Sequence, residues 1–167
     1  MCKSNMTKDE LDNLKIFDII LCDFTNGREG FELVGCHPFV ICQNNLGNKF
    51  SPTVLGMGMT SNISKSYMQT HCVVQRDREN GLKYDSVLMG ETLTQISKER
   101  IIYKMGSVTD ERTQDDIMNI FLSNITGKKS YGSGWTQIVK SMFQLIRESN
   151  DEERVKYHEQ KRSRAFN

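Results

Sequence analysis

The sequence of 167 residues lacks long hydrophobic runs and has no pair of cysteines spaced as C-x-x-C. No apolar stretch approaches the ~20 residues that a membrane-spanning helix needs. The five cysteines are odd in number, so neither a disulfide framework nor a zinc site is indicated, and we expect reduced thiols. The first 13 residues are polar, unlike a signal peptide. We therefore expect a cytoplasmic protein with no membrane partner, metal or other cofactor.

The chain also has little net charge, because 22 Lys and Arg face 21 Asp and Glu. The charge is unevenly distributed. Residues 128–167 hold nine basic and five acidic side chains, a net charge of +4, which leaves −3 for residues 1–127. Binding of a polyanion by the body of the protein would therefore need a local positive patch or help from the tail.

The first half of the chain has the pattern of a short helix followed by several short strands. "TKDELDNLK" (7–15) predicts the helix, since Thr7 and Glu10 fit a capping box. "NNLGN" (44–48) reads as a turn. Apolar and β-branched runs predict strands at 16–24, 38–43 (beginning at Pro38), 53–59 and 70–75, and one or two more within 80–96. Two glycines in the third strand suggest a bend or a close backbone approach.

"TDERTQDDIMNIFLSNITG" (109–127) predicts a helix that closes the domain. Thr109 is the expected N-cap, acidic residues fill the first turn and Gly127 suits the C-terminal end. Short strands followed by a helix predict an α+β fold, a small and mainly antiparallel β barrel or twisted sheet with helices. We assign residues 1–127 to one domain, with 1–15 as an N-terminal helical extension.

Residues 128–167 form a separate extension in this interpretation. Its segment 135–147 has apolar residues at helical spacing, which indicates an amphipathic helix. The first interpretation of this helix is that it docks on its own domain. Binding to a partner or to a membrane surface is the weaker one, because the polar face is not strongly basic.

The order of the strand sequences resembles the MazF/PemK toxins, which are small endoribonucleases of bacterial toxin–antitoxin pairs. The resemblance rests on "FDIILCDF", "GCHPFVICQNNLGNKFSPTVLGMGMTSNISK", "THCVV" and "KYDSVLMGETLTQISKERI", and "QNNLGNKFSPTV" is its most specific part. It covers residues 16 to about 127. It implies a strongly twisted antiparallel sheet resembling an SH3-like barrel, usually assembled as a homodimer. Residues 1–15 and 128–167 lie outside the usual family pattern.

The resemblance also implies a reaction and its partners. The family cleaves single-stranded RNA at short motifs without a metal, and a cognate antitoxin neutralises it. The ribose 2′-OH attacks the adjacent phosphorus, which leaves a 2′,3′-cyclic phosphate and a 5′-OH. This chemistry needs a proton acceptor, a proton donor and hydrogen bonds to the phosphoryl oxygens.

Three residues of this chain fall on catalytic positions of the family. Thr60 matches the family threonine after the third strand, and Glu32 matches a glutamate in the loop before the second strand. His37 stands where the family has an arginine, directly before the proline. Histidine titrates near neutral pH and can serve as a general acid or base, whereas arginine acts chiefly as a charged donor. The same change is also compatible with a lost phosphate clamp.

A second set of residues is expected to contact RNA. Ser61 and Asn62 follow Thr60, with strand-end capping as their alternative role. Glu91 is kept from the family pattern, but Thr92 and Thr94 replace its glutamine and arginine, which weakens the expected hold on RNA. The candidate positive contacts, each equally interpretable as an ordinary surface charge, are Arg28, Lys49 and Lys65.

Two other functions fit the same sequence. The fold also occurs in toxins that bind DNA gyrase without cutting RNA, and the loss of two family arginines fits such a binding module. The motifs "GNKFSPTV" and "MTSNIS" favour the ribonuclease branch instead. In a third reading the protein is a degenerate toxin, and its own segment 135–146 covers the RNA groove.

Overall fold

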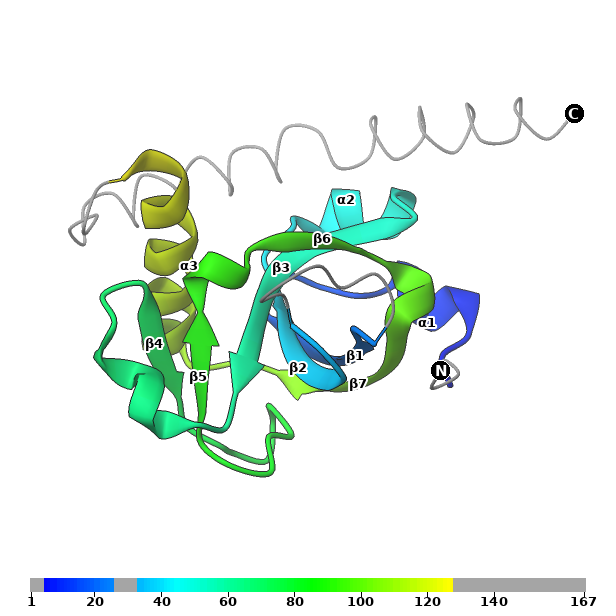
Figure 1. The fold of residues 1–167 in the computed structure, drawn as a ribbon. Helices are drawn as coiled ribbons and strands as arrows, with labels where there is room; N and C mark the ends of the chain where they lie inside the picture. Colours follow the sequence, from blue (N-terminus) through cyan, green and yellow to red (C-terminus); the bar gives the residue numbers. More distant parts are fainter. Residues whose placement is uncertain (1–4, 26–32, 128–167) are drawn as a thin grey trace, which may run out of the picture. The chain divides into compact units, whose positions relative to one another are not determined.

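The computed structural model describes residues 5–25 and 33–127, and its strands form one antiparallel sheet (Figure 1). The strands are β1 (Asp18–Asp23), β2 (Cys36–Ile41), β3 (Thr53–Thr60), β4 (His71–Val74), β5 (Ser86–Met89), β6 (Thr94–Ser97) and β7 (Ile101–Ser107). Their order is β4-β5-β3-β2-β1-β7, and β6 pairs with β3 beside this path. The α+β class with a twisted antiparallel sheet is therefore confirmed.

The helices of the described part are short except for the last. They are α1 (Lys8–Asp12), α2 (Asn45–Phe50) and α3 (Glu111–Thr126), with 3₁₀ turns η1 (Ile63–Tyr67), η2 (Gly90–Thr92) and η3 (Lys98–Arg100). The predicted capping box of α1 is present, since Thr7 and Glu10 bond each other's backbone N–H. At the other end of the domain, Gly127 ends α3 with a φ of +68°, as predicted.

Three local predictions were wrong. Residues 44–48 do not form a turn but begin α2, because the Asn44 side chain accepts the Gly47 N–H and so caps a helix. The N-cap of α3 is Asp110 and not Thr109. Pro38 lies inside β2 and not at its start. In addition, β7 was not predicted, although it pairs along β1.

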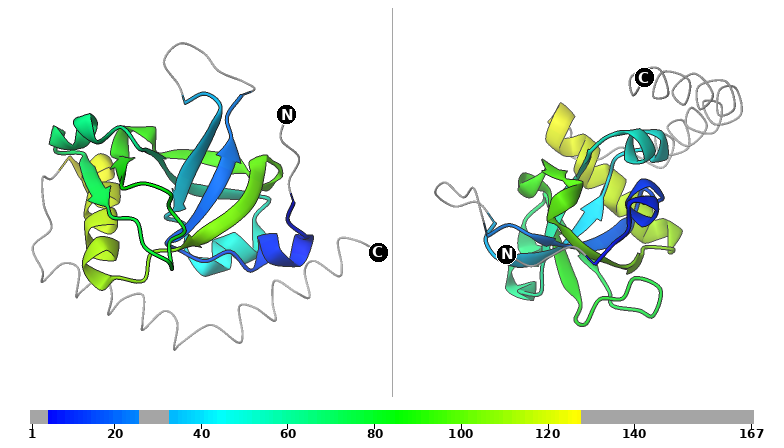
Figure 2. Two further views of the ribbon diagram at one scale, coloured as in Figure 1. Left: turned by 90° about the horizontal axis from the view of Figure 1, so that it is seen from below. Right: turned by 90° about the vertical axis from the view of Figure 1, so that its right-hand side faces the viewer.

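Two apolar cores lie on the two faces of the sheet. One includes Val40, Met57 and Leu88 from the strands and is closed by Ile117 and Ile120 of α3. The other includes Phe39 and Ile41 from β2, with Leu14 from the segment after α1. Figure 1 and the left view of Figure 2 show α3 beside β4 and β5, and α1 near α2. Each face of the sheet thus buries its own set of side chains.

Several predictions fall outside the described residues. These are the candidate site residues Arg28 and Glu32, the amphipathic segment 135–147 and the whole extension 128–167. The four cysteines of the described part form no disulfide, and the thiols of Cys22, Cys42 and Cys72 have raised pKa values because burial disfavours the thiolate. Within residues 5–25 and 33–127, no helix is long and apolar enough to cross a membrane.

Candidate active site

Thr60 is half-buried and ends β3, and a short polar turn follows it. Its Oγ1 accepts the backbone N–H of Asn62 at 3.2 Å. The Asn62 side chain accepts in turn from the backbone and hydroxyl of Ser64, at 3.2 Å and 2.6 Å, and so caps η1. A threonine hydroxyl that accepts a hydrogen bond keeps its own proton to donate. Thr60 can therefore still donate to an oxygen of a bound phosphate.

His37 is the second residue of β2 and is half-buried. Its Nε2 lies 2.8 Å from the carbonyl oxygen of Val34, and its ring leans on Phe24, with ring centroids 6.5 Å apart. Because a carbonyl can only accept, Nε2 must carry the proton of this bond. The neutral ring then has its basic lone pair on Nδ1. Gly35, with a φ of +86°, makes the turn that lets the chain fold back to this bond.

The pairing of β2 with β3 puts His37 and Thr60 at the same end and on the same face of the sheet. The register pairs Phe39 with Gly58 and Ile41 with Gly56. Continued by two residues, it sets His37 opposite Thr60. Side chains alternate between faces along a strand, so both point to the face that carries Phe39. The two sequence-predicted residues therefore converge on one region.

The other predicted residues divide between this region and distant ones. Ser61, Asn62 and Lys65 follow Thr60 directly and are exposed. Lys49 lies in α2, at the opposite end of β3, and its ammonium sits 5.2 Å from the centre of the Phe50 ring. The eight residues of β3 span about 25 Å. Lys65 thus lies in η1, the turn that follows Thr60, whereas Lys49 lies at the opposite end of β3.

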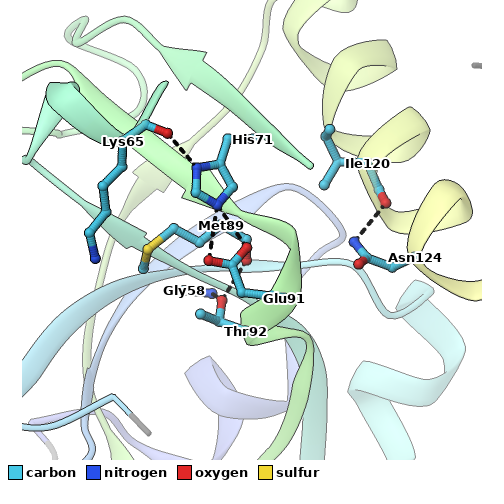
Figure 3. A network of polar contacts seen from close by, with 8 residues as sticks. All are labelled: Gly58, Lys65, His71, Met89, Glu91, Thr92, Ile120 and Asn124. Carbon is cyan, nitrogen blue, oxygen red and sulfur yellow. Dashed lines mark hydrogen bonds and ion pairs between the residues drawn. The ribbon is translucent and has the colours of Figure 1, made fainter. Parts of the chain in front are cut away.

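Glu91 lies in η2, and its carboxylate is engaged by a residue that the sequence did not single out. His71, the first residue of β4, places Nε2 at 2.7 Å and 3.0 Å from the two Glu91 oxygens (Figure 3). Its Nδ1 lies 2.6 Å from the carbonyl oxygen of Lys65. The His71 side chain has no exposed surface, whereas that of Glu91 is 50% exposed. Only the location of a histidine at the start of an apolar strand marks this residue in the sequence.

Thr92, the residue of η2 that departs from the family pattern, links this turn to β3. Its Oγ1 accepts the backbone N–H of Gly58 at 2.7 Å and donates to the Met89 carbonyl at 2.6 Å. Figure 3 shows these bonds below the His71–Glu91 pair. In the described part of the chain, no three His, Cys, Asp or Glu side chains gather in a way that could hold a metal ion.

Residues 15–121 match the family described as PemK-like, MazF-like toxin of type II toxin–antitoxin system. An Endoribonuclease MazF of Staphylococcus saprophyticus is 33% identical over 98 residues, which are 59% of this chain and 80% of that protein. Among solved structures, MazF from Deinococcus radiodurans matches with a TM-score of 0.56 and 11% identity over 69% of this chain and 97% of that one. An endoribonuclease from a mycobacterial species matches with a TM-score of 0.52 and 17% identity, covering 69% and 92%.

Proposed function

The chain belongs to the PemK-like, MazF-like toxin family, and from this premise we propose that it is an endoribonuclease toxin that cleaves single-stranded RNA. The Staphylococcus relative, named an endoribonuclease, supports the activity. The family belongs to type II toxin–antitoxin systems, which supports an antitoxin protein as the partner. We further propose a cytoplasmic homodimer, with residues 1–127 as the toxin domain and 128–167 as an extension.

The observation that supports the proposal is the β2–β3 register, in which Phe39 pairs with Gly58. Continued by two residues, this register sets His37 opposite Thr60 on one face of the sheet. In the proposed reaction, Nδ1 of His37 takes the proton of the ribose 2′-OH, whose oxygen then bonds to phosphorus. The bond from phosphorus to the 5′ oxygen breaks, and this oxygen leaves with a proton from the imidazolium or from water. The products are a 2′,3′-cyclic phosphate and a 5′-OH, and no metal takes part.

The neighbouring groups would stabilise the charge that builds up on the phosphoryl oxygens. The Thr60 hydroxyl donates a hydrogen bond, and the Lys65 ammonium adds positive charge from the following turn. Ser61 and Asn62 lie between these two residues and are placed to contact the nucleotide. Glu32 and Arg28, which precede β2 in the sequence, are the remaining proposed contributors. Glu32 would hold the cationic His37 ring, and Arg28 would contact RNA.

The proposal is tested by incubating the purified protein with a long single-stranded RNA in excess EDTA. We expect discrete fragments ending in 2′,3′-cyclic phosphate. His37→Ala and Thr60→Ala should each lower the cleavage rate about 100-fold or more, because each removes a group that acts in the transition state. Lys8→Ala removes an exposed charge of α1 and serves as the matched control, with an unchanged rate.

Absence of cleavage by the intact protein and by a chain ending at Gly127 would overturn the proposed function. That result would favour the non-cleaving binding module. Cleavage by the shortened chain alone would favour the third reading, in which the extension covers the RNA groove. Cleavage that survives in His37→Ala would leave the activity standing and remove His37 from the reaction.

A further inference from the structure

His71 is a buried titratable group for which the proposed reaction has no use. Its ring has acceptors at both nitrogens, the Lys65 carbonyl at 2.6 Å and the Glu91 carboxylate at 2.7 Å. A neutral imidazole can donate only one hydrogen bond, and neither a carbonyl nor an ionised carboxylate can donate one back. Glu91 is half exposed, so water solvates its negative charge. Both bonds form together when the His71 ring carries two protons.

These two bonds join η1, the turn that follows Thr60, to η2. The Lys65 carbonyl belongs to η1, which follows Thr60, Ser61 and Asn62 without a break. Glu91 belongs to η2, which Thr92 ties to the backbone of Gly58 in β3. Figure 3 shows the ring lying between the Lys65 carbonyl and the Glu91 carboxylate. The protonated ring thus holds the turn after Thr60 against a turn that is anchored on the same strand.

His71 also faces the same side of the sheet as Thr60. The register pairs His71 with Met89 and Thr60 with Val87, and Met89 and Val87 are two residues apart on β5. Side chains two residues apart on a strand share a face. The bridge that His71 makes between Glu91 and the Lys65 carbonyl, called the clamp below, therefore lies on the face where the RNA would bind. This is also the face of Thr60, to which a phosphate contact is assigned.

We propose that His71 is a positioning residue: in its doubly protonated form, bridging Glu91 and the Lys65 carbonyl, it holds residues 61–65 in place to bind RNA. This inference rests on the proposed function. Loss of one proton leaves a single donor for two acceptors, so one of the two bonds must break. If the η1 bond is lost, Lys65 and the polar side chains before it are no longer held beside Thr60. RNA binding therefore weakens when the ring loses one proton and with it the bond to η1.

The charged group that contacts the His71 ring is the Glu91 carboxylate. Glu91 faces it from η2, and Lys65 of η1 presents its carbonyl while its ammonium extends away, as Figure 3 shows. On β4 itself, Cys72 is neutral at physiological pH because burial, and then the nearby Asp116 of α3, raise its pKa to about 12. Glu91 is thus the charge that pairs with the imidazolium.

The first arm of the test measures kcat and KM for RNA cleavage as a function of pH. In the wild-type protein, KM should rise at high pH by about ten-fold, the effect of losing one charged hydrogen bond. Glu91→Gln is the matched variant, because its amide can donate to Nε2 while Nδ1–H still donates to the Lys65 carbonyl. A neutral ring then keeps both bonds, so the rise in KM should disappear. His71→Asn should raise KM at every pH with a smaller change in kcat.

The second arm needs no RNA and uses NMR on the free protein. We expect protons on both nitrogens of His71 at low pH, and amide signals of residues 61–65 that change when the ring loses one of these protons. In Glu91→Gln these amides should no longer follow this loss. The inference is overturned if the ring is singly protonated throughout, if the amides do not follow it, or if KM is flat in a wild-type enzyme that cleaves. A wild-type protein that cleaves nothing overturns the proposed function and with it the role of His71 in RNA binding, whereas the NMR result would still establish the clamp.

Discussion

At the scale of the residue, two glycines of β3 set how closely its neighbours approach. A Cβ at Gly56 would run into the backbone carbonyl of Val40 and the ring of Phe39. A Cβ at Gly58 would meet the end of the Leu33 side chain and the Thr92 hydroxyl. The sequence predicted a bend or a close approach here, and the close approach is confirmed. At Gly56 an added Cβ would collide with strand backbone, whereas at Gly58 it would collide with the flexible end of a side chain.

Gly56→Ala should therefore be more destabilising than Gly58→Ala. Overpacking a core costs about 1–3 kcal/mol, and we expect Gly56→Ala at or above the top of this range because strand backbone must move. Gly58→Ala should fall near the bottom, since the end of Leu33 can turn aside. Urea denaturation of the wild type and of the two variants measures the difference in the free energy of unfolding. Equal losses would show that β2 shifts as easily as a side chain.

At the scale of the element, α3 illustrates how local chemistry starts and ends a helix. The Asp110 carboxylate accepts from the hydroxyl and the backbone N–H of Thr113, at 2.7 Å and 2.8 Å. These bonds hold the pKa of Asp110 below its ordinary 3.8, and the bond from the Thr113 hydroxyl has the larger effect. A lowered pKa means that the folded state binds this proton less readily than the unfolded state. The cap therefore stabilises the fold fully above pH 3.8 and stops doing so as the pH falls through the lower, folded pKa.

Asp110→Ala should lower the melting temperature at neutral pH because it removes this cap. The difference from the wild type should shrink on acidification, as the wild-type carboxylate takes up a proton. Asp110→Asn is the control, since its amide oxygen still caps the helix and has no proton to gain in this range. Circular dichroism melts from neutral pH down through the carboxyl range provide the measurement. A constant difference for Asp110→Ala would contradict a pKa-linked cap.

At the scale of the whole molecule, the described cores lie within the proposed toxin domain. The buried apolar residues of the described part run from Leu14 to Ile120, and both faces of the sheet are covered by segments of residues 5–127. Such a domain needs no further segment to bury its apolar side chains. The boundary at 127 stays a prediction, which a shortened chain can test.

A chain ending at Gly127 should unfold cooperatively, with a melting temperature within about 4 °C of the full chain, a change of roughly 1 kcal/mol for this size. Calorimetry of both chains under the same conditions measures this. An aggregated or non-cooperative shortened chain would show that residues 128–167 cover apolar surface of the domain. That outcome would support the first reading of the amphipathic segment 135–147, docking on its own domain.

The sequence alone was sufficient for the fold class, most strands, the capping box of α1 and the glycine that ends α3. The domain boundary at 127 and the catalytic roles of His37 and Thr60 stay predictions. Alternation of apolar residues and the capping residues act over a few positions, so they are readable without the fold. Local signals failed where two of them competed. Asn44 can open a turn or cap a helix, and Thr109 and Asp110 are both good caps, so only the folded backbone selects between them.

The tertiary structure decided which side chains meet. His71 and Glu91 are 20 residues apart, and no local pattern links them, yet the pairing of β4 with β5 sets one beside the other. The same holds for Lys49, which the sequence grouped with Lys65 by charge and which the fold places at the far end of β3. The sequence shows which chemical groups each residue carries. Strand register determines which other side chains those groups contact, because register depends on pairing between segments that are distant in the sequence.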